Sequence, residues 1–172
     1  WVRSFAEIYN PMLAIKVIKL LIEKGISSEL CMVGPEKDGS LAKCKEYAQR
    51  KNLPVTFTGK LKKSEWINLS KEYDVFINTT NFDNMPVSVI EAMALGIPVI
   101  STNVGGMPYL IKHNETGILV SLQDEHAFVK EIQNLMNNPV KAQELAKNAR
   151  KLVEGFDWEI VKEKWNDLLD TV

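Results

Sequence analysis

The chain has 172 residues, of which 45% are hydrophobic, and this is enough to form the core of one domain. Its 21 basic and 22 acidic side chains nearly cancel, so the composition lacks the basic excess that binds nucleic acid. No apolar run approaches the roughly 20 residues of a membrane helix, and no charged-then-apolar leader opens the chain. We therefore expect a soluble domain with no nucleic-acid partner and no membrane contact.

Short β-branched runs alternate with longer helical patterns over the first 120 residues. A first helix is expected to begin at Asn10 and Pro11 and to end at Gly25, because these residue types cap, start and end helices. Further helices are expected at about 41–51, at 64–70 and from Pro86, and strands at 1–3, 28–34, 54–59, 73–79, 97–102 and 116–120. This alternation predicts an α/β fold with a doubly wound, mostly parallel, Rossmann-like sheet.

The chain beyond residue 123 follows a purely helical pattern. Three amphipathic helices are expected there, and the last of them has an apolar face that includes Trp158, Trp165 and Leu169. No repeat or linker interrupts the chain, so residues 1–172 are expected to form a single domain with a helical carboxyl-terminal extension. The opening "WVR" lacks methionine and looks like the end of a strand, which suggests a piece of a longer protein.

Several common kinds of site are missing from the sequence. There is no Gly-x-Gly-x-x-Gly turn after the first strand, no Walker loop and no Gly-flanked nucleophile turn, which argues against dinucleotide dehydrogenases and P-loop nucleotidases. Cys31 and Cys44 lack metal-ligand spacing and are expected to be reduced thiols of a cytoplasmic protein, with a single disulfide as the alternative. His113 and His126 are expected to be surface residues.

Ligands of open parallel sheets bind beyond the carboxyl ends of the strands, so a site is expected in the loops that follow strands. The loop from Thr79 to Met85 joins the strand at 73–79 to the helix that starts at Pro86. The first N–H groups of such a helix are unpaired and its dipole is positive there, which favours an anion such as phosphate. Asp83 and Asn84 can either line this site or simply cap the helix.

One carboxylate, Glu91, lies within the otherwise apolar run "VSVIEAMALG". No side chain three or four residues away along the helix can pair with its charge. A carboxylate withdrawn from water needs hydrogen-bond donors, which the hydroxyl groups of a bound sugar or ribose would supply. The alternative is an ion pair with a lysine or arginine from elsewhere in the fold.

Two further features are expected at the same edge of the sheet. The turn "NVGGMP" contains Gly105 and Gly106, which either form an ordinary turn or let the backbone approach a ligand closely. Arg3 follows the first strand, where its guanidinium can offer two parallel hydrogen bonds to a diphosphate or can remain solvated. Together with the loop 79–85, these features predict one binding site.

The segment "DNMPVSVIEAMALGIPVISTNVGGMPYLI" closely resembles the most characteristic segment of the retaining glycosyltransferases of family 4, which use nucleotide sugars and have the two-domain GT-B architecture. "VGP", "VTFTGKL" and "YDVFINTT" occur in the order found in the carboxyl-terminal, donor-binding domain of that family. The resemblance covers nearly the whole chain. It implies the donor-binding half of a hexosyltransferase that moves a sugar from a nucleotide diphosphate sugar to a glycan or glycolipid, as in polysaccharide biosynthesis.

The resemblance also implies roles for individual residues. Glu91 would accept hydrogen bonds from the ribose, Asp83 would contact the transferred sugar, and Arg3 would stabilise the departing diphosphate. The other donor-binding residues implied are Asn84, Met85, Pro86, Val87, Ser88, Lys60, Leu61 and Gly105. Backbone N–H groups of the loop would hold sugar and phosphate, and the Lys60 loop would line the nucleobase. No metal and no other cofactor is implied.

The implied partners are the nucleotide-sugar donor and an acceptor-binding amino-terminal GT-B domain, which these 172 residues do not include. The fragment alone is therefore expected to be inactive. The expected location is the cytoplasm, where the whole enzyme could be peripheral to the inner face of a membrane. Two positions depart from the family pattern: Asp83 replaces the usual glutamate, and Ile8 replaces the usual lysine five residues after the arginine.

Other interpretations of the same residues stay open. One is a non-catalytic nucleotide-sugar-binding or protein-interaction module of the same fold. Another is a GT-B nucleotide-sugar epimerase or a starch- or glycogen-type synthase, which the short loops and the lack of extra catalytic histidines disfavour. A receiver-type signalling domain would need an acidic cluster after the first strand, and the sequence has none there.

Overall fold

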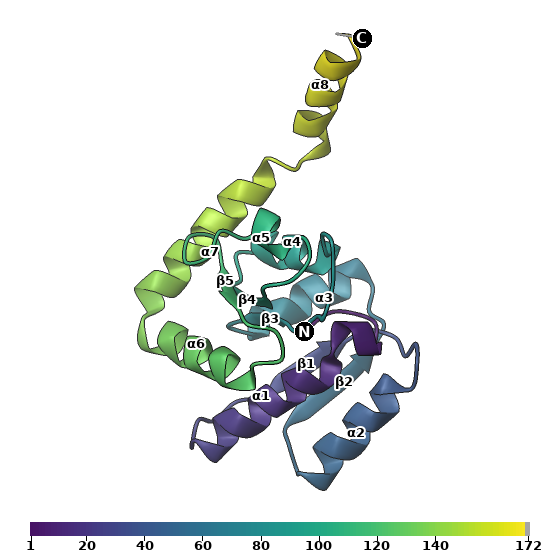
Figure 1. The fold of residues 1–172 in the computed structure, drawn as a ribbon, viewed down its shortest axis with the longest axis vertical. Helices are drawn as coiled ribbons and strands as arrows, with labels where there is room; N and C mark the ends of the chain where they lie inside the picture. Colours follow the sequence, from purple (N-terminus) through teal and green to yellow (C-terminus); the bar gives the residue numbers. More distant parts are fainter. Residues whose placement is uncertain (171–172) are drawn as a thin grey trace.

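A computed structural model describes residues 1–170 and shows an α/β fold built on parallel strands, as predicted (Figure 1). The strands are β1 Leu30–Val33, β2 Val55–Gly59, β3 Phe76–Asn78, β4 Val99–Thr102 and β5 Ile118–Val120. Each of them lies inside a run that the sequence predicts as a strand.

The strands form two separate parallel sheets, which differs from the single sheet expected from the sequence. β1 pairs with β2, and β4 lies between β3 and β5. The expected strand at 1–3 makes only one isolated bridge, from Val2 to Val33, and Phe5 makes another to Glu36. Residues 1–5 therefore pair with the end of β1, and within residues 1–170 no ladder joins β1 to β3.

The helices confirm the predicted pattern with one addition. They are α1 Pro11–Glu23, α2 Ser40–Arg50, α3 Lys63–Leu69, α4 Val87–Ala94, α5 Met107–Leu110, α6 Glu125–Asn137, α7 Pro139–Glu154 and α8 Trp158–Leu169, with short 3-10 turns at Glu7–Tyr9 and Ser70–Glu72. The pattern does not predict α5, because a helix of about one turn is too short to show a period. The expected cap is present at α1, where the Asn10 side chain accepts a hydrogen bond from the Leu13 N–H at 3.3 Å.

Helix packing divides the buried core into two clusters. α1 packs on α6, and this pair covers a cluster that includes the fully buried Phe5 and Phe128. α4 packs on α7 over a second cluster, in which Val89 and Met93 of α4 are fully buried. The apolar face of α4 thus anchors this helix to the core, and this anchoring fixes the position of its amino-terminal end.

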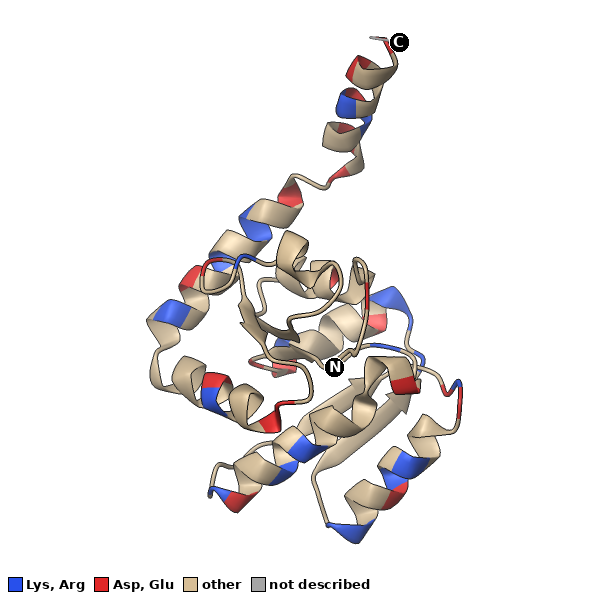
Figure 2. Cartoon of the chain, in the orientation of Figure 1, with Lys and Arg blue, Asp and Glu red and all other residues tan. Residues whose placement is uncertain are grey.

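The last helix, α8, has no buried residue and extends away from the rest of the fold (Figure 1). Its apolar side chains are exposed, with Trp158 and Leu169 each 66% exposed and Trp165 53% exposed. An amphipathic helix normally buries its apolar stripe, and nothing in residues 1–170 covers this one. Figure 2 shows that α1, α2 and α8 each carry both basic and acidic positions.

Both cysteines are buried and unpaired, which confirms the prediction of free thiols. Burial raises the pKa of the Cys44 thiol to about 12, so this thiol stays protonated at neutral pH. His113 and His126 are exposed, as expected. Within residues 1–170, no helix combines the length and the apolar character that crossing a bilayer requires.

The amino group of Trp1 is buried and donates a hydrogen bond to the Cys31 carbonyl oxygen at 3.1 Å. Burial lowers the pKa of this amino group from 8.0 to about 6. Between these two values the unfolded chain binds a proton that the folded chain does not, so stability rises with pH. We expect the free energy of unfolding to increase by about 2 kcal/mol from about pH 6 to about pH 8.

Urea denaturation of protein with a free Trp1 amine measures this increase. Acetylation of the same amine supplies the control, because an acetylated terminus does not titrate and the increase should disappear. Equal pH dependence in the free and the acetylated protein would assign the effect to other groups.

Candidate functional site

Buried threonines at the carboxyl ends of β3 and β4 fasten together the loops in which the sequence predicts a site. Thr102 Oγ1 donates to the Thr80 carbonyl oxygen at 2.6 Å, and Thr79 Oγ1 donates to the Asn10 carbonyl oxygen at 2.9 Å. All three threonines are fully buried. The predicted site residues do not include these threonines. Their position at the carboxyl ends of two adjacent strands is the sequence signal that could have identified them.

The glycine pair brings the loop after β4 against the loop after β3. The Gly106 N–H donates to the Asp83 carbonyl oxygen at 2.8 Å. A Cβ atom on Gly106 would lie 1.6 Å from the Asn84 carbonyl oxygen, and one on Gly105 would lie 2.0 Å from the Asp83 carbonyl oxygen. Gly105 also has a positive φ of 53°. These glycines therefore permit a close backbone approach, and the segment they approach is the predicted site loop itself.

Four backbone N–H groups at the start of α4 have no acceptor in the described structure. They belong to Asn84, Met85, Val87 and Ser88. Pro86, the residue before the helix, has no N–H to donate. Such unpaired donors, together with the positive end of the helix dipole, make this end of α4 suited to an anion. The buried Ser88 Oγ also lacks a hydrogen-bond partner.

Arg3 and Asp83, which the sequence predicts at one site, form an ion pair through Arg3 Nη2. Both side chains are largely buried, at 17% and 14% exposed. The guanidinium of Arg3 also stacks over the Tyr9 ring, 4.0 Å from its centroid, while its buried Nε has no hydrogen-bond partner. The Arg3 backbone is held tightly, because a Cβ on Gly34 would lie 1.7 Å from the Arg3 carbonyl oxygen.

Glu91 is paired with a lysine, as one of the two interpretations of its charge expects. Lys63, at the first position of α3, places its Nζ 3.1 Å from Glu91 Oε1. The Glu91 side chain keeps 24% of its exposure, so a ligand can still reach it, and Lys63 is 71% exposed. An ion pair with so exposed a partner contributes little stability. Glu91 is thus paired with Lys63 and remains partly exposed to solvent.

The other predicted residues lie on exposed loops at strand ends. Lys60 and Leu61 follow the carboxyl end of β2, with Lys60 exposed and Leu61 partly buried. Beside the free N–H groups, Phe82, Met85 and Val87 are unusually exposed for apolar side chains, at 54%, 52% and 63%. Among residues 1–170, no three His, Cys, Asp or Glu side chains gather where they could hold a metal ion.

A cavity of about 980 Å³ lies at the opposite edge of the sheets, between the starts of β1 and β3. Its lining includes Leu30, Pro54, Phe76 and Pro98, which stand at or just before the first residues of the strands. None of the predicted site residues contributes to it. The cavity and the candidate site are therefore separate features.

Comparisons with known proteins agree on one family. Residues 2–152 match the family described as glycosyl transferases group 1. The capsular polysaccharide biosynthesis glycosyltransferase CapM of Staphylococcus aureus is 28% identical over 159 residues, which are 91% of this chain and 41% of CapM. The chain thus spans less than half the length of that relative.

Solved structures share the fold at lower identity. The crystal structure of Anabaena HepE in complex with UDP has a TM-score of 0.89 and 18% identity, and the match covers 99% of this chain and 48% of HepE. The carboxyl-terminal domain of the group 1 glycosyl transferase LpcC from Francisella tularensis has a TM-score of 0.77 and 17% identity, with 89% of this chain and 82% of that one covered. The second match shows that a carboxyl-terminal domain alone has this fold.

Proposed function

Because the chain belongs to the family of group 1 glycosyl transferases, we propose that it is the donor-binding half of a retaining hexosyltransferase. The enzyme would move a sugar from a nucleotide diphosphate sugar to a glycan or glycolipid during polysaccharide assembly. The name of CapM, which refers to capsular polysaccharide biosynthesis, supports this class of product. The complex of HepE with UDP supports a nucleotide diphosphate as the ligand.

The group of unpaired N–H donors at the start of α4 is the observation that carries the proposal. A diphosphate brings the charged oxygen acceptors that these donors lack. Arg3 adds a further donor, since its Nε is buried without a partner while its Nη2 is bound to Asp83 in the same loop. An unsatisfied buried donor is costly, and a phosphate oxygen would remove that cost.

In the proposed reaction the bond between the anomeric carbon and the diphosphate oxygen breaks, and its electron pair leaves with the diphosphate. The acceptor hydroxyl attacks from the same face and passes its proton to the departing diphosphate, so the new bond forms with retained configuration. Negative charge that develops on the diphosphate would be stabilised by the α4 N–H groups and Arg3. Ile8 adds no charge here, because its side chain is aliphatic. Its carbonyl oxygen accepts from the Asn81 N–H at 2.8 Å. No metal and no other cofactor is needed for this scheme.

The two acidic residues are proposed to recognise the sugars of the donor. Asp83 would accept hydrogen bonds from the transferred sugar while it stays paired with Arg3. Glu91 would accept hydrogen bonds from the ribose. The exposed Lys63 can swing away from Glu91 at little cost. Lys60 and Leu61 would line the nucleobase. The remaining proposed donor-binding residues are Asn84, Met85, Pro86, Val87, Ser88 and Gly105.

We propose an amino-terminal domain of the same enzyme as the partner that completes the site. The exposed apolar stripe of α8 supports this partner, because the helix reaches away from the fold and needs a surface to cover it. The acceptor would bind on that domain, so the fragment alone would be inactive. The proposed location is the cytoplasm, with the whole enzyme peripheral to the inner face of a membrane.

Glu91→Gln is expected to weaken the binding of UDP to the chain about tenfold, because a neutral amide loses the charge-assisted hydrogen bonds to the ribose. Lys63→Met is the matched control, since it removes the partner of Glu91 and leaves the carboxylate in place. The Lys63 variant should bind UDP at least as tightly as the unaltered chain. Isothermal titration calorimetry with UDP compares the three proteins.

A purely structural role for Glu91 gives a different pattern. If the carboxylate only pairs with Lys63, both substitutions leave the affinity for UDP unchanged. That pattern would contradict the proposed role of Glu91 in binding the donor.

A further inference from the structure

The guanidinium of Arg3 is held by contacts of two different kinds. Its Nη2 is paired with the Asp83 carboxylate, which occupies one edge of the planar group. The Tyr9 ring covers one face of the same group, with the Arg3 Cζ 4.0 Å from the ring centroid. A ring contact uses the face of the cation, whereas a carboxylate uses its N–H donors. The contact with Tyr9 therefore leaves every N–H of Arg3 free for a ligand.

The backbone that carries Tyr9 is fixed to the loop that follows β3. Thr79, which is fully buried, donates its Oγ1–H to the Tyr9 carbonyl oxygen at 3.2 Å. Asn81 donates its N–H to the Ile8 carbonyl oxygen at 2.8 Å and its Nδ2–H to the Glu7 carbonyl oxygen at 3.1 Å. These bonds place Tyr9 at a fixed position beside the predicted site loop.

The backbone of Arg3 is fixed separately, to the end of β1. Its N–H donates to the Val33 carbonyl oxygen at 3.0 Å, and its own carbonyl oxygen lies where Gly34 leaves no room for a Cβ. The long arginine side chain would otherwise rotate about several single bonds, and ordering it costs entropy. Contact with the Tyr9 ring orders this side chain before a ligand arrives, so less of that cost falls on binding.

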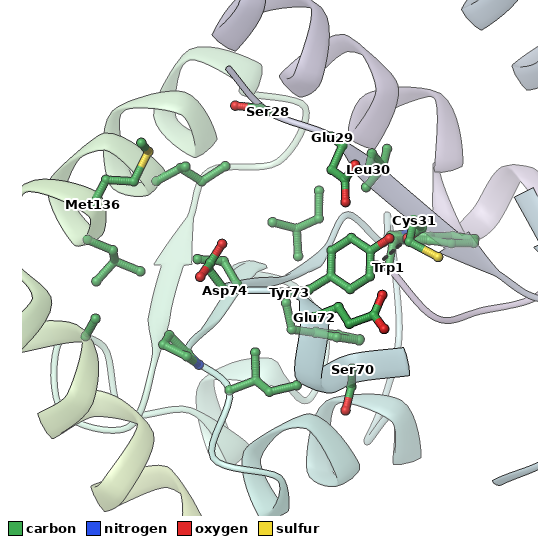
Figure 3. Close-up of a pocket in the computed structure, with 18 of the residues that line it drawn as sticks. Trp1, Ser28, Glu29, Leu30, Cys31, Ser70, Glu72, Tyr73, Asp74 and Met136 are labelled. Atoms are coloured by element: carbon green, nitrogen blue, oxygen red, sulfur yellow. Dashed lines mark hydrogen bonds between the residues drawn. The ribbon is translucent and has the colours of Figure 1, made fainter. Parts of the chain in front are cut away.

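One donor of the Arg3 guanidinium has no acceptor. Its Nε is buried and lacks a hydrogen-bond partner within residues 1–170. The cavity between the starts of β1 and β3 does not account for this donor, because the lining of that cavity, part of which Figure 3 shows, includes neither Arg3 nor Tyr9. An acceptor for Nε would therefore have to come from a ligand of the candidate site.

We propose that Tyr9 is a positioning residue of this site, which holds the Arg3 guanidinium by its face and keeps its donors available to an anionic ligand. The proposal rests on the proposed function, since it takes the diphosphate of the donor as that ligand. An incoming diphosphate competes with Asp83 for the N–H donors of Arg3, but it does not compete with the ring. The contact with Tyr9 therefore persists whether or not the ion pair does.

Filling of space is the alternative role, because Tyr9 is half-buried and packs against the core cluster that contains Phe5 and Phe128. Two substitutions separate the two roles. Tyr9→Phe keeps the ring and removes only the hydroxyl, whereas Tyr9→Leu keeps apolar bulk and removes the ring face. Urea denaturation checks that both variants fold, and Tyr9→Met repeats the test with a more adaptable side chain if the leucine variant is unstable.

NMR of the arginine Nε–H groups tests the contact without any ligand. The chain has three arginines, and the signal of Arg3 is the one that Arg3→Met removes. Because protons above an aromatic ring are shielded, the Arg3 signal should move downfield in Tyr9→Leu and stay in place in Tyr9→Phe. The signals of Arg50 and Arg150 should not change in either variant. An Arg3 signal that ignores Tyr9→Leu, or that moves equally in both variants, would overturn the proposal.

Calorimetry with UDP measures the consequence for binding. Tyr9→Leu is expected to weaken the binding of UDP about tenfold, as the loss of a partly buried cation–π contact would, whereas Tyr9→Phe should stay within about twofold. This effect should require Arg3, so Tyr9→Leu should cause no further loss in the Arg3→Met background, where ligand-observed NMR follows the weaker binding. An equal loss in that background would show that Tyr9 acts independently of Arg3 and would overturn the proposal.

The two measurements distinguish this proposal from the proposed function. The NMR comparison contains no nucleotide, so it decides whether Tyr9 holds Arg3 even if this chain alone does not bind UDP, and its failure leaves the proposed function standing. If the Arg3 signal responds as expected while Tyr9→Leu binds UDP as tightly as the unaltered chain, Arg3 does not meet the diphosphate. That result would overturn the diphosphate as the ligand for which Tyr9 positions Arg3.

Discussion

Gly106→Ala is expected to lower the free energy of unfolding by about 3 kcal/mol and to remove measurable binding of UDP. The new Cβ would lie 1.6 Å from the Asn84 carbonyl oxygen, which is a backbone atom and cannot rotate away. The two site loops would have to separate, which breaks the 2.8 Å bond from the Gly106 N–H to Asp83 and displaces the free donors before α4. Urea denaturation and calorimetry with UDP measure the two effects.

Gly155→Ala is the control for this substitution. Gly155 has a φ of −70°, and a Cβ there would meet nothing closer than the Leu152 carbonyl oxygen at 3.3 Å. It lies after α7, outside the site loops, so stability should change by less than about 1 kcal/mol and UDP binding should not change. If the Gly106 variant behaved like this control, the contact between the loops would not be what holds the site.

Arg3→Met is expected to weaken the binding of UDP about a hundredfold, because it removes the one arginine at the predicted site and its charge-assisted bonds to phosphate. Methionine keeps an unbranched apolar side chain against the Tyr9 ring, which limits the loss of packing. Calorimetry with UDP at two salt concentrations measures the affinity, and its salt dependence should decrease in the variant.

Asp83→Asn separates the role of the charge from that of the ion pair. This substitution breaks the ion pair with Arg3 and leaves the Arg3 guanidinium free to bind phosphate. UDP should therefore bind at least as tightly as it does to the unaltered chain. A nucleotide diphosphate sugar should lose affinity instead, since Asp83 is proposed to hold its sugar. Equal weakening of UDP binding by both substitutions would show that the pair only maintains the structure.

The sequence predicts the helices and strands well, because each element carries its own signal. Asn10, Pro11 and Gly25 mark the ends of α1 through cap, first-turn and terminator chemistry, and the structure places α1 within them. The division into two sheets could not be predicted in this way. Strands that pair lie far apart in the sequence, as β1 and β2 do, and a β-branched run does not record its partner.

At the site, the positions of the residues along the chain predict that Arg3 and Asp83 lie close together, but they do not predict which charged side chains form ion pairs. Arg3 and Asp83 meet because both follow parallel strands, whose carboxyl ends share one edge. The sequence does not select a partner for Glu91, since Lys63 begins a helix 28 residues earlier and only the folded arrangement brings their charges to 3.1 Å. It does not predict the stacking of Arg3 on Tyr9 for the same reason.

In its ion pair with Asp83, the Arg3 guanidinium already has an anionic partner, so any anionic ligand competes with the Asp83 carboxylate. An incoming anion has to share or displace a carboxylate that is already in place and only 14% exposed. A singly charged anion gains little from such an exchange, because it replaces one negative charge by another. A group with several negative oxygens can occupy the free N–H donors and Arg3 at once, so the pair selects for ligands of high charge.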